Sequence, residues 1–153
     1  MSRCWVLVRH AEATPTGAGM PDRERPLTRA GRRQAAECAR WLGEREELSD
    51  LPMLVSPARR TQQTAELVRT GWHAGPVRTE AGIWNATQGT LLAILREAGD
   101  AILVGHNPGV EMLARSLSGR VVPVGVGAAL VFEIDADERV RLVARFQPSS
   151  DSA

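Results

Sequence analysis

Three short apolar runs stand out in the pattern of hydrophobic and polar positions along the chain. They cover residues 4–8, 53–55 and 101–104, and each is followed directly by polar residues or glycine. Runs this short and this uniformly apolar are typical of strands that are buried on both faces. We therefore predict three buried parallel strands at these positions.

Segments with the apolar spacing of amphipathic helices lie after these runs. The stripes are Ala35, Cys38, Ala39 and Leu42; Thr61, Ala65 and Val68; Leu91, Ile94, Leu95 and Ala98; and Val110, Leu113, Ala114 and Leu117. Two helices carry a start signal, because Ser56 and Asn107 each precede a proline and are expected to cap the first turn.

The alternation of strands and helices predicts a parallel sheet that is covered on both sides. After Gly119 the pattern changes, and residues 127–134 and 140–146 read as an antiparallel strand pair at the sheet edge. The expected fold is an α/β protein: a three-layer α/β/α sandwich with a mostly parallel central sheet. We expect one domain over residues 1–148, a loop over 14–26 and a frayed C-terminal tail over 149–153.

Composition excludes several kinds of chemistry. All 19 basic residues are arginine, so no mechanism that needs a lysine applies, and the net charge of +1 does not favour nucleic-acid or membrane partners. Cys4 and Cys38 lie too far apart for a Cys-x-x-Cys zinc site, and we expect neither a metal nor another cofactor. With no signal peptide or membrane span evident, the expected location is the cytoplasm.

Each of the three apolar runs ends in polar residues suited to chemistry. Arg9 and His10 follow the first run, Ser56 opens the segment to Arg60 after the second, and His106 follows the third. Ligands of parallel sheets bind beyond the carboxyl ends of the strands, so these residues are expected to converge. Arginines, imidazoles and helix N-termini together suit a phosphoryl group.

Nucleophilic displacement at phosphorus fits this set of residues. A neutral imidazole can attack phosphorus, hold the phosphoryl group as phosphohistidine and release it to water. Arginines would stabilise the negative charge on the phosphoryl oxygens. A second histidine that donates to these oxygens is expected to be protonated, a state that a phosphoryl dianion favours.

Four segments resemble motifs of the histidine phosphatase superfamily. Residues 9–12 are similar to its Arg-His-Gly signature, with Ala11 in third place, and residues 56–65 to its Ser-Pro-x-x-Arg-Ala-x-Gln-Thr segment, with Thr61 replacing alanine. Residues 105–108 match its Gly-His-Asn-Pro motif, and residues 25–31 resemble a stretch of the SixA-type branch, the bacterial phosphohistidine phosphatases. The likeness covers roughly residues 4–118.

The resemblance implies roles for individual residues. His10 would be the nucleophile, and Arg9, Arg60 and His106 would bind the phosphoryl group. Candidates for the pocket rim are Arg25, Arg59, Asn107 and Trp84, and weak candidates for a general acid are Glu80 and Glu12. Ordinary structural roles compete with some of these: a solvated basic face for Arg25, a helix surface for Arg59 and packing for Trp84. We expect His73 to be a surface histidine.

The resemblance also bears on the substrate. Larger members of the superfamily have an acid after a later strand and often a helical lid, and neither is evident here. Because the imidazole of a phosphohistidine can leave without an acid, the expected partner is a phosphorylated protein, with a phosphotransfer domain as one candidate. The alternatives are a small-molecule phosphomonoesterase, a phosphoglycerate-mutase-like enzyme, or a phosphate-binding module without turnover.

Overall fold

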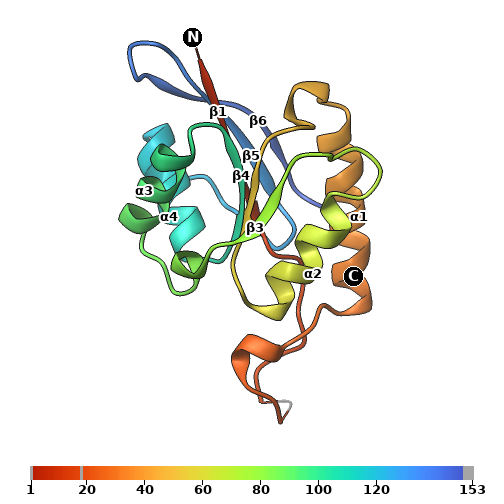
Figure 1. Ribbon diagram of the computed structural model, residues 1–153. Coiled ribbons are helices and arrows are strands. Elements are labelled where there is room, and N and C mark those ends of the chain that lie inside the picture. The colour runs from red at the N-terminus through yellow and green to blue at the C-terminus, as the bar shows by residue number, and fades with distance from the viewer. Residues whose placement is uncertain (1, 18, 150–153) are drawn as a thin grey trace.

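A six-stranded mixed sheet forms the centre of the molecule, in the order β3-β2-β4-β1-β5-β6 (Figure 1). The structure is a computed structural model that describes residues 2–17 and 19–149. The strands are β1 (Arg3–Arg9), β2 (Met53–Val55), β3 (Val77–Thr79), β4 (Ala101–Gly105), β5 (Ala129–Ile134) and β6 (Val140–Phe146). The first four in chain order run parallel to one another, and β5 and β6 are antiparallel at one edge.

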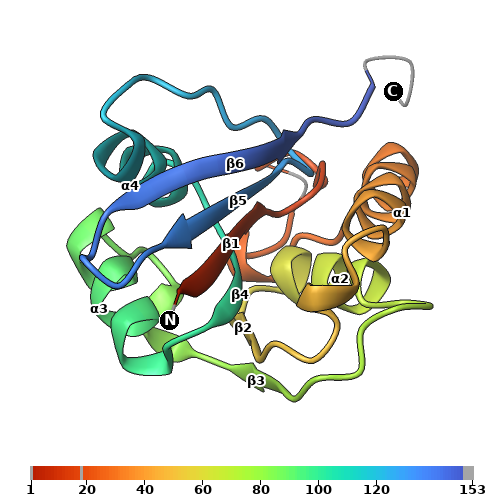
Figure 2. The same cartoon turned by 90° about the horizontal axis from the view of Figure 1, so that it is seen from above.

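Two helices cover each face of this sheet, as Figure 2 shows. The helices α1 (Arg29–Gly43) and α2 (Arg59–Val68) lie on one face, and α3 (Gln88–Ala98) and α4 (Gly109–Ser118) lie on the other. The expected three-layer α/β/α sandwich with an antiparallel edge pair is confirmed.

The side chains of β1 alternate between two apolar layers. Val6 and Val8 pack on the side of α1 and α2, and Trp5 and Leu7 pack on the side of α3 and α4. All four are at most 2% exposed. Burial on both faces explains why this strand reads as an unbroken apolar run rather than an alternating one.

Four short elements were not expected from the apolar pattern. They are β3 and the three 3-10 helices η1 (Asp22–Glu24), η2 (Glu46–Leu48) and η3 (Ala81–Ile83). The element η1 lies within the segment that was predicted as a loop, and a bridge between Ala13 and Leu27 holds the two ends of that segment together. In Figure 1 this segment hangs below the carboxyl ends of the strands.

The two expected helix starts need correction. The helix α2 begins two residues after Pro57, with Ala58 at the N-cap, and the hydroxyl of Ser56 contacts His106 instead of a helix N–H group. The helix α4 begins after Pro108, although Asn107 Oδ1 does accept the N–H group of Glu111 at 3.1 Å. Ser56 is therefore free to serve the polar cluster beyond the strands.

At the carboxyl end of the chain, Ser149 donates its N–H group to Glu37. The rest of the tail that was predicted to be frayed, residues 150–153, lies outside the described residues. Within the described part, no helix is both long and apolar enough to cross a membrane.

Candidate active site

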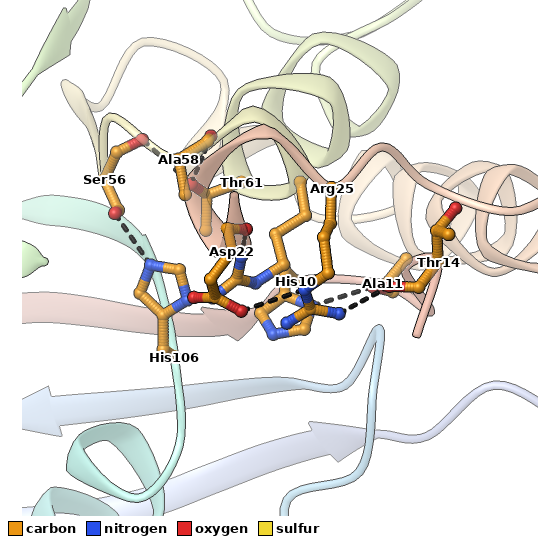
Figure 3. Close-up of polar contacts among 10 residues, drawn as sticks. His10, Ala11, Thr14, Asp22, Arg25, Ser56, Ala58, Thr61 and His106 are labelled. Carbon is orange, nitrogen blue, oxygen red and sulfur yellow. Dashed lines mark hydrogen bonds and ion pairs between the residues drawn. The ribbon is translucent and has the colours of Figure 1, made fainter. Parts of the chain in front are cut away.

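The carboxyl ends of the three central strands bring the expected polar residues together. Arg9 ends β1, Ser56 follows β2 and His106 follows β4. The parallel pairing continues past the strands, because His10 N donates to Gly105 O at 3.1 Å. Figure 3 shows His10, Ser56 and His106 gathered in one group of polar side chains.

His10 is held with one ring nitrogen occupied. Its Nδ1 lies 2.8 Å from the carbonyl oxygen of Ala11, and only 9% of the residue is exposed. A carbonyl accepts but cannot donate, so Nδ1 carries the proton of the neutral ring and Nε2 carries the lone pair. Burial, together with the charges of Arg60 and Arg9, lowers the pKa of His10 to about 4 despite the opposing effect of the Ala11 hydrogen bond. The imidazole is therefore neutral near pH 7.

The backbone around His10 is fixed from two further directions. Gly127 N donates to His10 O at 3.0 Å, and Ala11 N donates to Thr64 Oγ1 on α2 at 3.0 Å. Thr64 Oγ1 in turn donates to Arg60 O. The main chain of the candidate nucleophile and the first turn of α2 are thus parts of one hydrogen-bonded unit.

His106 faces the same space with its other edge bonded to Ser56. Its Nε2 lies 2.7 Å from Ser56 Oγ, and its Nδ1 is buried without a hydrogen-bond partner. The ring centroids of His106 and His10 are 5.4 Å apart. Burial lowers the pKa of His106 to about 3, with smaller lowering by His10 and Arg60 and an opposing effect of Asp22.

This geometry offers His106 a second way to donate, besides the protonated form that was expected with a bound phosphoryl group. The hydroxyl of Ser56 can donate to Nε2, which leaves the proton of a neutral ring on Nδ1. Nδ1–H then serves as a donor to an anion without an imidazolium. The low pKa of His106 makes this neutral form the resting one.

Arg9 is anchored through the outer part of its guanidinium. Nη1 donates to Val124 O at 3.0 Å, and Nε is buried without a partner. Asn107 Nδ2 donates to the same carbonyl at 2.9 Å, and Glu111 Oε2 accepts from Val124 N at 2.9 Å. Burial lowers the pKa of Arg9, and the charge of Glu111 opposes that shift.

Arg60 shows the same division between its inner and outer nitrogens. In the first turn of α2, its Nη1 donates to Asp22 O at 2.8 Å and its Nη2 lies 3.3 Å from Asp22 Oδ2. Its Nε is buried without a partner. Burial is the main effect that lowers the pKa of Arg60, and the charge of Asp22 opposes it.

Three buried donors of the cluster thus lack an acceptor: Nε of Arg9, Nε of Arg60 and Nδ1 of His106. A buried donor without a partner costs about 1–3 kcal/mol, and more when it is charged. Such groups are rare in native proteins, and a catalytic role or a bound ion is among the explanations for them. Donors on two guanidiniums and an imidazole suit the oxygens of a phosphoryl group.

A cavity of about 550 Å³ opens beside this cluster. It is lined by Asp22, Arg60, Ile83, Trp84, Asn85, Ala86, Thr87, Gln88, His106, Asn107, Pro108, Gly109 and Met112. His10 and Arg9 do not line it. The cavity therefore meets the cluster at Arg60 and His106.

The four rim candidates divide into three kinds. Trp84 and Asn107 line the cavity, and Trp84 meets the ring of His106 edge-on at 5.4 Å. Arg25 is not the solvated residue that its basic neighbourhood favours, because its side chain is 15% exposed and bonded to Asp22 and Thr14. Arg59 is exposed, as expected for a helix-surface residue.

Neither carboxylate that was considered as an acid lines the cavity. Glu80 pairs with Arg78 at 3.7 Å, and Glu12 accepts from Thr28 Oγ1 at 2.8 Å. Asp22 does line the cavity, and sequence reasoning missed it because it stands in a loop without a periodic pattern. Its one sequence signal is its place three residues before Arg25, within reach of an i,i+3 ion pair.

The prediction for His73 was wrong. The residue is 8% exposed, and its Nε2 lies 2.7 Å from Leu51 O. Its ring packs edge-on against Trp72 at 5.3 Å. The surrounding glycines suggested a surface turn, but the contacts with Trp72 and Leu51 bury the imidazole.

Metal-ligating groups do not gather in the described part of the chain. No cluster of three or more His, Cys, Asp or Glu side chains there is arranged to hold a metal ion.

Comparisons with known proteins identify similar sequences and similar structures. The histidine phosphatase superfamily (branch 1) matches residues 5–91. An uncharacterized protein of Mycobacterium tuberculosis, found in two strains, is 34% identical over 119 residues, which cover 73% of this chain and 72% of that protein.

Two solved structures extend the likeness to nearly the whole chain. A protein assigned as the phosphohistidine phosphatase SixA of Agrobacterium tumefaciens superposes with a TM-score of 0.83 at 26% identity, over 95% of this chain and 98% of that one. One assigned as an alpha-ribazole-5'-P phosphatase of Escherichia coli K-12 gives 0.71 at 19% identity, over 95% and 97%. The chain therefore belongs to the histidine phosphatase superfamily (branch 1) and is an enzyme of the phosphatase class.

Proposed function

We propose that this phosphatase hydrolyses the phosphoryl group of phosphohistidine side chains in proteins, through a covalent intermediate on Nε2 of His10. The observation that carries the proposal is the state of the His10 ring. Nδ1 is occupied by Ala11 O, so the lone pair on Nε2 belongs to a neutral and buried imidazole. A neutral imidazole in a fixed orientation is an effective nucleophile toward phosphorus.

The unpartnered donors supply the rest of the reaction. Nε of Arg9, Nε of Arg60 and Nδ1 of His106 would bind the three non-bridging oxygens, on which negative charge gathers in the transition state. His10 would attack from the buried side, and the leaving group would depart into the cavity that Arg60 and His106 line. An in-line displacement would expel the leaving group on the side of phosphorus that faces away from His10.

Two features support a protein phosphohistidine as the substrate. The cavity carries neutral polar groups from Asn85, Thr87 and Gln88, which can donate to and accept from an uncharged imidazole leaving group. The similarity to a protein assigned as a phosphohistidine phosphatase also favours this substrate class. The imidazole of phosphohistidine leaves readily because its second nitrogen can already carry a proton.

The test traps the intermediate with two labelled donors. A ³²P-labelled phosphohistidine protein and ³²P-labelled p-nitrophenyl phosphate are each mixed with the enzyme, and the reaction is quenched in alkali, where phosphohistidine survives. We expect alkali-stable label on the wild type and none on His10→Ala, with faster turnover of the phosphohistidine donor.

A matched pair of arginine variants serves as the control. Arg60→Ala is expected to lower kcat/KM by 10²-fold or more, whereas Arg59→Ala, one residue earlier on the exposed side of the same helix, should leave it unchanged. Label on His10→Ala equal to that on the wild type would overturn the assignment of the nucleophile. Faster turnover of the phosphomonoester than of the phosphohistidine would overturn the proposed substrate class.

A further inference from the structure

Asp22 stands where the phosphoryl cluster meets the cavity. Its carboxylate is 2.9 Å from Nε of Arg25 and 3.3 Å from Nη2 of Arg60, and Figure 3 shows its side chain on the side where His10 and His106 lie. Among the described residues that line the cavity, it is the one carboxylate. A carboxylate beside a phosphate site repels a phosphoryl dianion. Its presence there therefore calls for a functional explanation.

Asp22 and the phosphoryl group do not compete for the same atoms. Asp22 takes Nη1 and Nη2 of Arg60, while Nε of Arg60 is left without a partner. A phosphoryl group bound to the unpartnered donors would therefore lie next to Asp22 on one guanidinium. Because the leaving group departs into the cavity, the bridging oxygen would lie on the side that Asp22 lines.

We propose that Asp22 is the proton-transfer residue of the reaction, the role for which Glu80 and Glu12 were the sequence candidates. The inference rests on the proposed phospho-His10 intermediate. Asp22 gives a proton to the leaving oxygen of a phosphomonoester and takes a proton from the water that hydrolyses the intermediate.

The two half-reactions balance. In the first, a bond forms between His10 Nε2 and phosphorus, the bond from phosphorus to the leaving oxygen breaks, and that oxygen takes the proton of the Asp22 carboxylic acid. In the second, a water oxygen bonds to phosphorus, the P–Nε2 bond breaks with its electron pair returning to His10, and the Asp22 carboxylate takes a proton from the water. Inorganic phosphate leaves, and both side chains are restored.

Substrate binding prepares the carboxyl group for this role. In the free enzyme burial raises the pKa of Asp22, but the hydrogen bond from Arg25 and the charges of Arg60 and Arg25 outweigh that effect and hold it below its usual value. A phosphoryl dianion compensates the same arginine charges and adds a negative charge nearby. Both changes favour the protonated acid when an ester is bound.

Asp22→Asn removes the proton-transfer group together with its charge, and the amide keeps one oxygen, which can accept from Arg25 or from Arg60 but cannot replace both contacts. The fate of the phosphoenzyme therefore separates a role in proton transfer from a role in charge pairing. We expect kcat for an alkyl phosphate, whose leaving group needs a proton, to fall by about 10²-fold or more. With p-nitrophenyl phosphate, whose leaving group needs none, the first step should survive and the second should slow. The variant should then show a burst of p-nitrophenol and more alkali-stable phospho-His10 than the wild type.

Glu24→Gln provides the matched control. Glu24 lies on the same 3-10 helix but does not line the cavity, so its neutralisation should leave both substrates unaffected. If Asp22→Asn slowed both substrates by the same factor without accumulation of phosphoenzyme, Asp22 would be a positioning residue for Arg60 and the inference would be overturned. If kcat/KM were unchanged or higher for both substrates, Asp22 would be only a counter-ion of the arginines, and the inference of proton transfer would also be overturned.

The two proposals fail in different ways. If the wild type forms no phosphoenzyme with any donor, the proposed intermediate is wrong and Asp22 has no such reaction to serve. If the wild type forms phosphoenzyme and Asp22→Asn hydrolyses it as fast, the intermediate stands and only the role of Asp22 is lost.

Discussion

The side chain of His10 combines two properties that usually exclude each other, burial and availability for reaction. Its Nδ1 is consumed by Ala11 O, and the cost of a charge in this place keeps the ring neutral. The arginines that would bind a phosphoryl group also disfavour the imidazolium. In the proposed function, one set of residues thereby prepares both the candidate nucleophile and the site for its target.

A first prediction concerns the titration of this ring. With its pKa lowered to about 4, His10 should stay neutral at pH 5.5, where an ordinary histidine is roughly nine-tenths protonated. Carbon-13 NMR of the labelled imidazoles, assigned with His10→Gln, measures this directly. Saturation with tungstate, a phosphate-like oxyanion, should raise the pKa because it compensates Arg9 and Arg60. A His10 resonance that titrates at 6.5 or above in the free enzyme would contradict the prediction.

Ser56 carries a second prediction at the same scale. If its hydroxyl donates to Nε2 of His106, the ring proton of the neutral wild type sits on Nδ1, which nitrogen-15 shifts can report. In Ser56→Ala the ring loses this preference, and we expect kcat/KM to fall about tenfold, the effect of one hydrogen bond. Ser118→Ala, at the last residue of α4 and outside the cavity lining, is the control and should match the wild type. A wild-type ring protonated on Nε2 would refute the role of Ser56.

At the scale of elements, α1 is fixed against the loop that follows His10. Thr28 caps the helix by accepting from Gly31 N at 3.0 Å, and Thr28 N donates to Glu12 O at 3.0 Å. A Cβ on Gly31 would lie 2.1 Å from Glu12 O, which is part of the backbone. The helix can approach this loop closely only because residue 31 has no side chain.

A third prediction follows from that approach. Gly31→Ala should lower the free energy of unfolding by about 1–3 kcal/mol, since either the helix or the loop must move. Gly89→Ala is the matched helical control, because the nearest atom to its added Cβ is Thr87 Oγ1 at 3.8 Å, and alanine should stabilise α3 by up to about 1 kcal/mol. Urea denaturation measures both changes. Equal effects of the two substitutions would show that the contact with Glu12 is unimportant.

The elements also show what could be predicted from the sequence and what could not. Buried strands such as β2 and the stripe of Ala35, Cys38 and Leu42 were predictable because one burial environment extends over several residues. The strand β3 was not, since its three side chains are exposed and follow no apolar pattern. The 3-10 helix η1 could not be predicted for the same reason, because it has no buried residues and so no apolar pattern.

Within the candidate site, position along a strand was informative and contact partners were not. Arg9 ends a buried strand, and His10 and His106 each follow one, so their convergence could be predicted from topology. Asp22 depends on the path of a loop, and the burial of His73 depends on packing against its neighbour Trp72. Such tertiary details leave no periodic trace in the sequence.

At the scale of the whole molecule, the two histidines of the candidate site, His10 and His106, link folding to pH. Unfolded, each has a pKa of 6.5, whereas folding lowers the pKa to about 4 for His10 and about 3 for His106. Between these values the unfolded chain binds more protons than the folded protein. Stability is therefore present above pH 6.5 and is lost as the pH falls toward 4 and 3.

The fourth prediction is the size and origin of this loss. Each histidine contributes up to about 1.4 kcal/mol per pH unit within its window, and His106 contributes less because it is half-buried and partly screened. Urea denaturation between pH 6.5 and 4.5 should show a slope that is shallower in His10→Gln. Asp22 changes the free energy of unfolding only at lower pH, since its usual pKa is 3.8 and folding lowers that pKa further. An equal slope in the variant would exclude His10 as a source.

The direction of β1 has a practical consequence for handling the enzyme. This strand starts at Arg3, and after seven residues, roughly 20 Å, it delivers His10 to the opposite end of the sheet (Figure 1). An affinity tag or surface linker fused ahead of Arg3 would thus be attached at the end remote from the cavity. Enzyme immobilised in this way should present its opening to the solution, so that large phosphorylated proteins can reach it as freely as small reporter compounds.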